Sequence, residues 1–386
     1  IRNYKPIFKF LATRRKRLKP RSTTYFIGYA ERSLPSAERR PACVHCKLRQ
    51  IFDEFKKKFH KKYKDKKEEE MRILTFQESL CLVDFFQWRL YRTNLKFEAN
   101  EYSDWTYEEF LDKFTGIKVH KRSRRYTMGN KTLDKLLRSV PKAFSWLQCN
   151  VTSAVRSQGP CGSCYAFSSV DLASTQYNID HKIWEPSTAL SPQYITVQNK
   201  SLEIPTETCY PYKMVEGECQ KPTCTEDITR NLKIKWAKMI NATSNEKEIL
   251  SILLNRGPFV TLISVPQTLQ LYKSGIIRRP QCQVKAEHAV MIVGYNYTSS
   301  IPYYIVKNTW GKSWGEGGFF RIEAGTNTCG VAQFITVICT AENCANIYEP
   351  EKWQIPMNSM ECRQKIPLSN VDCCPCEQVC CPCPEI

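Results

Sequence analysis

Hydrophobic and polar positions divide the chain into a helical first part and a later part in which short apolar runs alternate with turn residues. Between residues 48 and 94, apolar residues recur at helical spacing in a lysine-rich background. The first such group consists of Ile51, Phe52, Phe55 and Phe59. A second helical stretch is predicted from about Lys66 to Leu90. Thr106 and Glu109 then have the spacing of a capping box, which predicts the start of another short helix.

From Val140 onward the pattern changes. A helix is predicted over Ser163–Asn178, and three strand-like runs follow between Gly-rich turns. These runs are Val290–Val293, Tyr303–Val306 and Phe319–Ile322. Because helices come first and strands later, we expect an α+β fold with two segregated halves. The stretch from Lys121 to Lys135 is polar and basic, which is typical of an exposed linker that proteases can cut.

The net charge of +19 is concentrated at one end of the 386-residue chain. Residues 1–140 carry 35 Lys and Arg against 17 Asp and Glu, a net charge of +18. The basicity is therefore a property of this N-terminal segment and not of the whole chain. A nucleic-acid-binding arm is the weaker interpretation of the segment. No uninterrupted apolar run of 18 residues occurs, so we expect no membrane span. Residues 1–20 lack the apolar run of a signal peptide; because the chain does not begin with Met, we expect that an N-terminal piece is missing.

Cysteine is abundant, with 20 residues, eight of them between positions 344 and 383. Five Asn-x-Ser/Thr sequons accompany them, at Asn130, Asn150, Asn199, Asn241 and Asn296. Together these features favour an oxidising compartment and disulfides. Cys43 and Cys46 have the spacing of half a zinc site, but a second half is missing nearby. We therefore expect neither a metal nor another cofactor.

The most informative motif is Gln158–Phe167, which reads QGPCGSCYAF. This motif resembles the region around the nucleophile of papain-like cysteine proteases. Cys164 is followed by His288 after 124 residues and by Asn308 after 144 residues, close to the separations of that family. Three later segments also resemble the family: Glu287–Val290 with Val293–Tyr295, Tyr303–Gly311 with Trp314–Gly315, and Asn327–Val331.

The resemblance implies a two-part papain-like fold and a specific chemistry. Cys164 would be the nucleophile, placed at a helix N-terminus and beside a His288 imidazolium that together favour its thiolate. Asn308 would orient the imidazole, and Gln158 would donate its side-chain amide to the oxyanion. Cys282 and Cys329 resemble the disulfide of the β-rich half.

A weaker resemblance upstream concerns the inhibitory propeptide of the family. Glu68, Arg72, Phe76 and Val83 follow its helical spacing, and Asn100, Tyr102 and Asp104 resemble its second motif. A generic lysine-rich helical hairpin is the alternative. The resemblance implies that this segment runs backward through the cleft until it is cut between Lys121 and Val140.

We therefore expect a basic, disordered leader (1–47), a helical inhibitory propeptide (48–115), a linker with the processing site (116–139), a papain-like peptidase domain (140–340) and a Cys-rich tail (341–386). The tail's Cys-Cys-Pro-Cys clusters suit a disulfide knot better than a metal site or palmitoylation. A resemblance to the cathepsin W and F branch comes from three places: the tail, Leu269–Tyr272 and Asn327–Cys329.

The connection between Ser191 and Tyr210 departs from the family pattern. It lacks the usual cysteine and the Cys-x-Gly-Gly segment that form a wall of the non-primed substrate subsites. Cys161 and Cys219 lose their usual partners with it, so they pair with each other, pair with Cys209 or Cys224, or stay free.

The leading functional hypothesis is a cysteine endopeptidase made as a zymogen. It would be lysosomal or secreted and monomeric, with peptides or proteins as substrates and its own propeptide as intramolecular inhibitor. The first alternative is a catalytically impaired papain-like protein that binds peptides or partners, since a substrate-subsite segment is missing. The second is an interaction protein whose basic leader binds nucleic acid or an anionic glycan.

Overall fold

The computed structural model describes residues 47–117, 141–196, 203–215, 232–234, 236–240, 246–282 and 286–341. The Cys43–Cys46 pair, the predicted processing region and the cysteine clusters of the tail lie outside these residues. The described part contains an N-terminal unit, residues 48–117, and a larger body.

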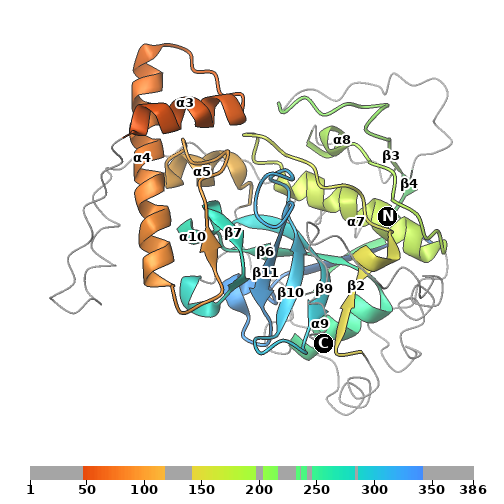
Figure 1. Ribbon diagram of the computed structural model, residues 1–386. Helices are drawn as coiled ribbons and strands as arrows, with labels where there is room; N and C mark the ends of the chain where they lie inside the picture. Colours follow the sequence, from red (N-terminus) through yellow and green to blue (C-terminus); the bar gives the residue numbers. More distant parts are fainter. Residues whose placement is uncertain are drawn as a thin grey trace.

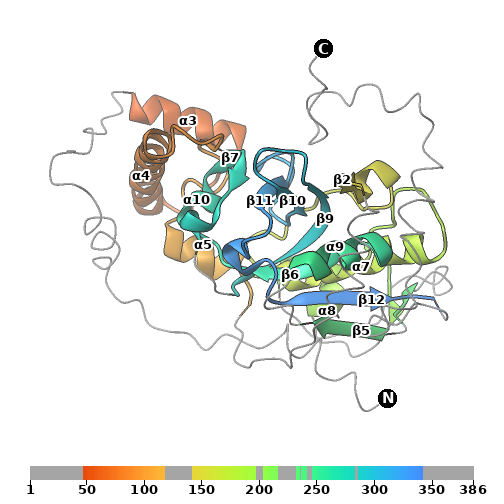
Figure 2. The same cartoon turned by 90° about the horizontal axis from the view of Figure 1, so that it is seen from below.

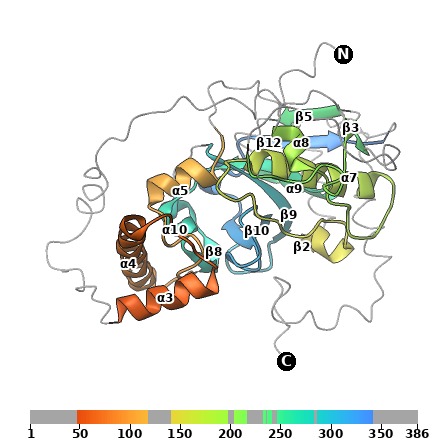
Figure 3. The same ribbon diagram turned by 90° about the horizontal axis from the view of Figure 1, so that it is seen from above.

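Two helices, α3 (Leu48–Lys58) and α4 (Lys66–Arg89), form most of the N-terminal unit, as the periodicity predicts. They pack through an aromatic cluster in which the ring centroids of Phe55 and Phe76 are 4.5 Å apart. A third helix, α5 (Tyr107–Phe114), begins at the predicted capping box, which the structure confirms: Thr106 and Glu109 each bond the other's backbone. Figure 3 shows α3 and α4 standing to one side of the body, with α5 reaching toward it.

The body joins a helical half to a mostly antiparallel sheet, which confirms the expected α+β class (Figure 1). Its helices are α7 (Cys164–Asp180), α8 (Pro192–Thr196), α9 (Glu246–Asn255), α10 (Gln267–Gln270) and the 3-10 turns η1 (Trp146–Cys149), η3 (Arg279–Gln281) and η4 (Thr328–Gly330). Its strands are β2 (Ala143–Ser145), β3 (Glu203–Ile204), β4 (Leu232–Lys233), β5 (Trp236–Ile240), β6 (Phe259–Ile263), β7 (Tyr272–Ser274), β8 (Ile276–Ile277), β9 (His288–Asn296), β10 (Tyr303–Lys307), β11 (Phe319–Glu323) and β12 (Ile335–Cys339).

The main sheet has the order β5-β12-β6-β9-β10-β11-β8, and β2 pairs with β9 outside this path. All nine residues of β9 are buried, because α7 packs beside this strand while β6 and β10 flank it (Figure 2). Ser168 of α7 donates its hydroxyl to the Ala289 carbonyl at 3.0 Å. The start of α7 and the start of β9 are thereby held against each other.

The N-terminal unit docks on the body through backbone pairing. Its strand β1 (Lys96–Phe97) pairs antiparallel with β7. Asn100 donates its amide to the Gln270 carbonyl at 2.8 Å, and the Tyr102 hydroxyl donates to the Trp310 carbonyl at 2.7 Å. Tyr102 and Trp310 belong to one hydrophobic core. After α5, the Ile117 backbone N–H donates to the Glu287 carbonyl at 3.2 Å, so the unit is fixed to the body on both sides of this helix.

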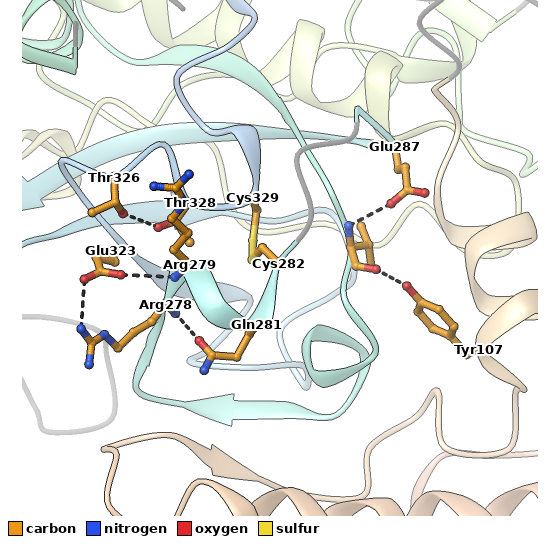
Figure 4. The surroundings of a disulfide bond; sticks show 11 residues. Tyr107, Arg278, Arg279, Gln281, Cys282, Glu287, Glu323, Thr326, Thr328 and Cys329 are labelled. Atoms are coloured by element: carbon orange, nitrogen blue, oxygen red, sulfur yellow. Dashed lines mark hydrogen bonds and ion pairs between the residues drawn. A yellow bond between two sulfur atoms is a disulfide. The ribbon is translucent and has the colours of Figure 1, made fainter. Parts of the chain in front are cut away.

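The predicted disulfide between Cys282 and Cys329 is confirmed, and it joins η3 to η4 at one end of the sheet (Figure 4). Cys81, Cys149, Cys209 and Cys339 are also disulfide-bonded. Cys161 and Cys164 carry free thiols. Of the possibilities that the sequence leaves open for Cys161, the free thiol is the one observed.

The unusually short connection after Ser191 is closed by local hydrogen bonds. The Ser191 backbone N–H donates to the Pro205 carbonyl at 2.9 Å, and its hydroxyl donates to the Tyr210 carbonyl at 2.6 Å. The helical half is therefore tied together locally despite the missing segment. In the described part of the chain, no helix is long and apolar enough to cross a membrane.

Candidate active site

Cys164 is the first residue of α7, and its side chain is fully buried. The loop before it turns at Gly159 (φ 56°) and Gly162 (φ 64°), conformations that glycine adopts without strain. The backbone N–H of Ala289 lies 3.5 Å from the Cys164 sulfur. Because Ala289 follows His288, the thiol lies beside the strand end that carries the predicted histidine.

The His288 ring is held by Asn308, which follows β10. His288 Nε2 lies 2.8 Å from Asn308 Oδ1, and the same oxygen accepts the Thr309 backbone N–H at 2.8 Å. Since this oxygen is an acceptor, Nε2 carries the proton and Nδ1 is the basic nitrogen. Nδ1 is buried without a hydrogen-bond partner among the described residues. The Trp310 ring stacks on the imidazole with 4.6 Å between centroids, shielding the His288–Asn308 bond from water.

Gln158 is held in place by Thr309, the residue after Asn308. Its Oε1 accepts the Thr309 hydroxyl at 2.6 Å, and its backbone N–H donates to the Thr309 carbonyl at 2.8 Å. The side-chain N–H groups are therefore the ones that face the site. The contact between Thr309 and Gln158 is not predicted from the sequence and is a finding of the structure.

Tyr212 supports the nucleophile loop from the other side. Its hydroxyl lies 2.5 Å from Ser163 Oγ and donates to the Gln158 carbonyl at 2.7 Å. Its ring packs edge-on against Phe167 of α7, with 4.7 Å between centroids. The sequence does not distinguish Tyr212, although this residue contacts Gln158 and Ser163 just before Cys164.

The end of the N-terminal unit covers the site. In this covering segment, residues 113–117, the Phe114 carbonyl accepts from Gln158 Nε2 and from Trp310 Nε1, each at 3.2 Å. The Gly116 backbone N–H also acts on the Cys164 thiol and opposes the rise of its pKa. A Cβ on Gly116 would lie 1.7 Å from the Gly162 carbonyl oxygen, so no other residue fits there.

Burial controls the protonation of the two central groups. It raises the pKa of the Cys164 thiol to about 11, although backbone donors from Ala289 and Gly116 oppose the shift. It lowers the pKa of His288 to about 4, although the hydrogen bond that His288 Nε2 donates to Asn308 opposes the shift. Both groups are neutral at pH 7. In the covered site the neutral pair is favoured, because the covering segment excludes the water that would stabilise the charges. The thiolate–imidazolium pair expected from the sequence concerns the uncovered site and stays a prediction.

The described residues contain no group of three or more His, Cys, Asp and Glu side chains placed to hold a metal ion. What the arrangement offers instead is a thiol beside Ala289, together with a basic ring nitrogen and an amide donor that residues 308–310 hold in place. These groups suit transfer of an acyl group to sulfur.

Comparison with known proteins agrees with this chemistry. The sequence pattern of the papain family cysteine proteases matches residues 140–198 and 193–339. The sequence pattern of the cathepsin propeptide inhibitor domain (I29) matches residues 52–110. The chain belongs to the papain family of cysteine proteases. It is a papain-like cysteine peptidase that carries the family's inhibitory propeptide, so the N-terminal unit is this propeptide.

Proteins similar to this chain occur in widely different organisms. A viral cathepsin of Choristoneura fumiferana defective polyhedrosis virus is 28% identical over 304 residues, covering 72% of this chain and 88% of the relative. The oryzain beta chain of Oryza sativa subsp. japonica is 31% identical over 298 residues, covering 69% and 60%. The structure of digestive procathepsin L2 proteinase from Tenebrio molitor larval midgut has a TM-score of 0.65 at 25% identity, covering 76% of this chain and 99% of that one. These relatives give no support to the non-catalytic alternative.

Replacing Thr309 by Val should disturb Gln158 while preserving side-chain size. Loss of an entire oxyanion donor lowers kcat by about 100- to 1000-fold, so loss of only its anchor should lower kcat about tenfold, with KM little changed. Thr309→Ser keeps the hydroxyl and is the matched control. Steady-state kinetics after propeptide removal measures both; a Thr309→Val enzyme with the wild-type kcat would contradict the assigned contact.

Replacing Gly116 by Val should displace the covering segment, since its Cβ has no room beside the Gly162 carbonyl. We expect Cys164 of the unprocessed chain to react with an epoxide thiol probe about tenfold faster or more. Lys113→Ala is the control, because the Lys113 side chain is half exposed and only its backbone carbonyl meets the site. Equal labelling rates in the two variants would show that Gly116 does not seal the site.

Proposed function

We propose that Cys164 is the nucleophile of this peptidase, that His288 is its base and acid, that Asn308 orients the ring, and that Gln158 binds the oxyanion. The observation that carries the proposal is the buried, unpartnered Nδ1 of His288, whose ring is fixed by Asn308 next to the residue that contacts the Cys164 sulfur. A basic nitrogen without a partner inside a protein costs stability, which is typical of a site kept for a reacting proton.

The reaction follows from these positions. Once the covering segment leaves, water reaches the site, and His288 Nδ1 takes the proton of the Cys164 thiol. The thiolate attacks the substrate carbonyl carbon, and the oxyanion accepts hydrogen bonds from Gln158 Nε2 and the Cys164 backbone N–H. His288 gives its proton to the leaving amine as the C–N bond breaks. A water molecule, deprotonated by His288, then hydrolyses the thioester and releases the thiol.

In the unprocessed chain, the propeptide opposes each of these steps. The Phe114 carbonyl accepts the hydrogen bond that Gln158 Nε2 would give to the oxyanion, and Gly116 lies against Gly162 beside the thiol. Burial keeps the thiol and the imidazole neutral. We propose that cutting within residues 116–139 separates the propeptide from the peptidase domain, which begins near residue 140, and so starts activity.

Cys164→Ala should reduce the turnover of peptide substrates by about a thousandfold or more, because the covalent route disappears. Cys161→Ala is the matched control: it removes a free thiol from the same loop and should keep kcat within about threefold. Peptide hydrolysis by the processed enzymes measures both. Full activity of Cys164→Ala would disprove the assignment of the nucleophile.

We further propose that the chain passes through an oxidising secretory compartment and ends in the lysosome or outside the cell. The Cys282–Cys329 disulfide and the Asn150 sequon support this destination. Asn150 is exposed and follows the turn η1 in a left-handed conformation. Asn296 is buried, and its Oδ1 accepts from Thr298 and Ser299, so a glycan there would break this turn.

Expression behind a cleavable signal sequence in a eukaryotic secretory host tests this proposal. We expect peptide mapping after glycosidase treatment to find an N-linked glycan at Asn150 and none at Asn296. Asn150→Gln should therefore remove one glycan, and Asn296→Gln should remove none. A secreted, folded chain that is unmodified at Asn150 or modified at Asn296 would contradict this assignment.

The monomeric state and the place in the cathepsin W and F branch stay predictions. The branch is supported by Leu269–Tyr272 in the body and by the cysteines after residue 341.

A further inference from the structure

A buried ionic cluster lies behind the site and is not used by the reaction described above. Its centre is Asp171 on α7, which is 3% exposed. One carboxylate oxygen accepts from Lys307 Nζ at 2.6 Å, and the other accepts from Arg156 at 2.5 Å. Lys307 also donates to the Ser153 hydroxyl at 2.8 Å, and Arg156 also binds Glu207 at 2.5 Å. The polar contacts of Asp171 thus join three separate stretches of the chain.

Each of these stretches carries a proposed catalytic residue close by. Arg156 is two residues before Gln158, and Lys307 is directly before Asn308. Asp171 lies seven residues after Cys164 on the same helix, about two turns away. The Asp171 carboxylate therefore connects three elements. These are the segment that carries Gln158, helix α7 that begins with Cys164, and strand β10 that ends just before Asn308.

A backbone hydrogen bond also couples the stretch of Arg156 directly to the stretch that follows Lys307. The Arg156 carbonyl accepts the Gly311 backbone N–H at 3.1 Å, next to the Gln158–Thr309 pair. Without Asp171, these two loops would stay paired with each other but would lose both ion pairs with α7, leaving the Arg156 guanidinium only over the Phe167 ring of that helix.

Charge balance also depends on Asp171. Burial alone would raise the pKa of its carboxyl group, but Lys307 and Arg156 outweigh burial and hold this pKa below its ordinary value. Lys307 is 2% exposed, and Asp171 is the carboxylate that its ammonium group contacts. A buried ion pair contributes little stability beyond what well-packed apolar residues would give. Stability alone is thus a weak reason for placing these charges here.

We propose that Asp171 is a positioning residue that fixes α7 relative to the loops of Gln158 and Asn308, and so sets the reach from the Cys164 sulfur to the His288 ring and to the oxyanion donor. This inference rests on the catalytic roles proposed above. Misplacement of reacting groups by about 1 Å can cost about 100-fold in rate, so the effect belongs in kcat.

The test uses Asp171→Asn in the full chain, activated by removal of the propeptide, with rates normalised to titratable Cys164. We expect kcat to fall by about 10- to 100-fold while KM stays within about threefold. Asp180→Asn is the matched control, since Asp180 is on the same helix but accepts from Thr340 at the far end. It should keep kcat within about twofold.

An unchanged kcat in Asp171→Asn, a change confined to KM, or an equal loss in Asp180→Asn would overturn the proposal. If Asp171→Asn fails to fold, the double variant Asp171→Asn/Lys307→Met decides, because it also removes the stranded ammonium group while Arg156 keeps Glu207. A low kcat in the folded double variant supports the proposal, and a wild-type kcat overturns it. Failure of the catalytic assignment itself is distinguishable, because wild-type activity would then not depend on Cys164.

Discussion

The hydrogen bond between His288 and Asn308 determines what the rest of the site can do. It fixes the proton on Nε2, leaves Nδ1 as the basic atom and holds the plane of the ring beneath Trp310. This bond exists only because β9 and β10 are neighbouring antiparallel strands, so that the start of one lies beside the end of the other. The sheet is thus the part of the fold that sets the tautomer.

The helical half contributes the second reacting group and depends on a different kind of contact. Cys164 begins α7, and the hydroxyl of Ser168 one turn later bonds the carbonyl of Ala289. The two halves therefore meet where both have ordered polar groups rather than only apolar surface. The propeptide uses this junction: its last described residues bond to Gln158 and Gly162 from the helical half and to Glu287 from the sheet.

Helices α3, α4, α5 and α7, the strands β9, β10 and β11 and the capping box at Thr106 could be predicted, because each depends on local periodicity or on a short motif. The Cys282–Cys329 disulfide could be expected from the family resemblance, whereas α9 and the strands β5, β6 and β12 gave no comparable local signal. The family could be inferred from the segment around Cys164. The neutral state of the covered site could not, since it depends on which distant segment excludes water from it. Asp171 gave no signal either: a single carboxylate within a helix is common, and only the fold brings Lys307 and Arg156 to it. The free thiol of Cys161 was one of several open outcomes because pairing depends on spatial neighbours.

Three consecutive residues, Asn308, Thr309 and Trp310, serve three different partners: the imidazole, the glutamine amide and the aromatic face of the ring. Their backbone geometry is shared, so a shift in this tripeptide would misalign proton transfer and charge stabilisation at the same moment. Tuning one property by redesigning this turn would therefore disturb the other.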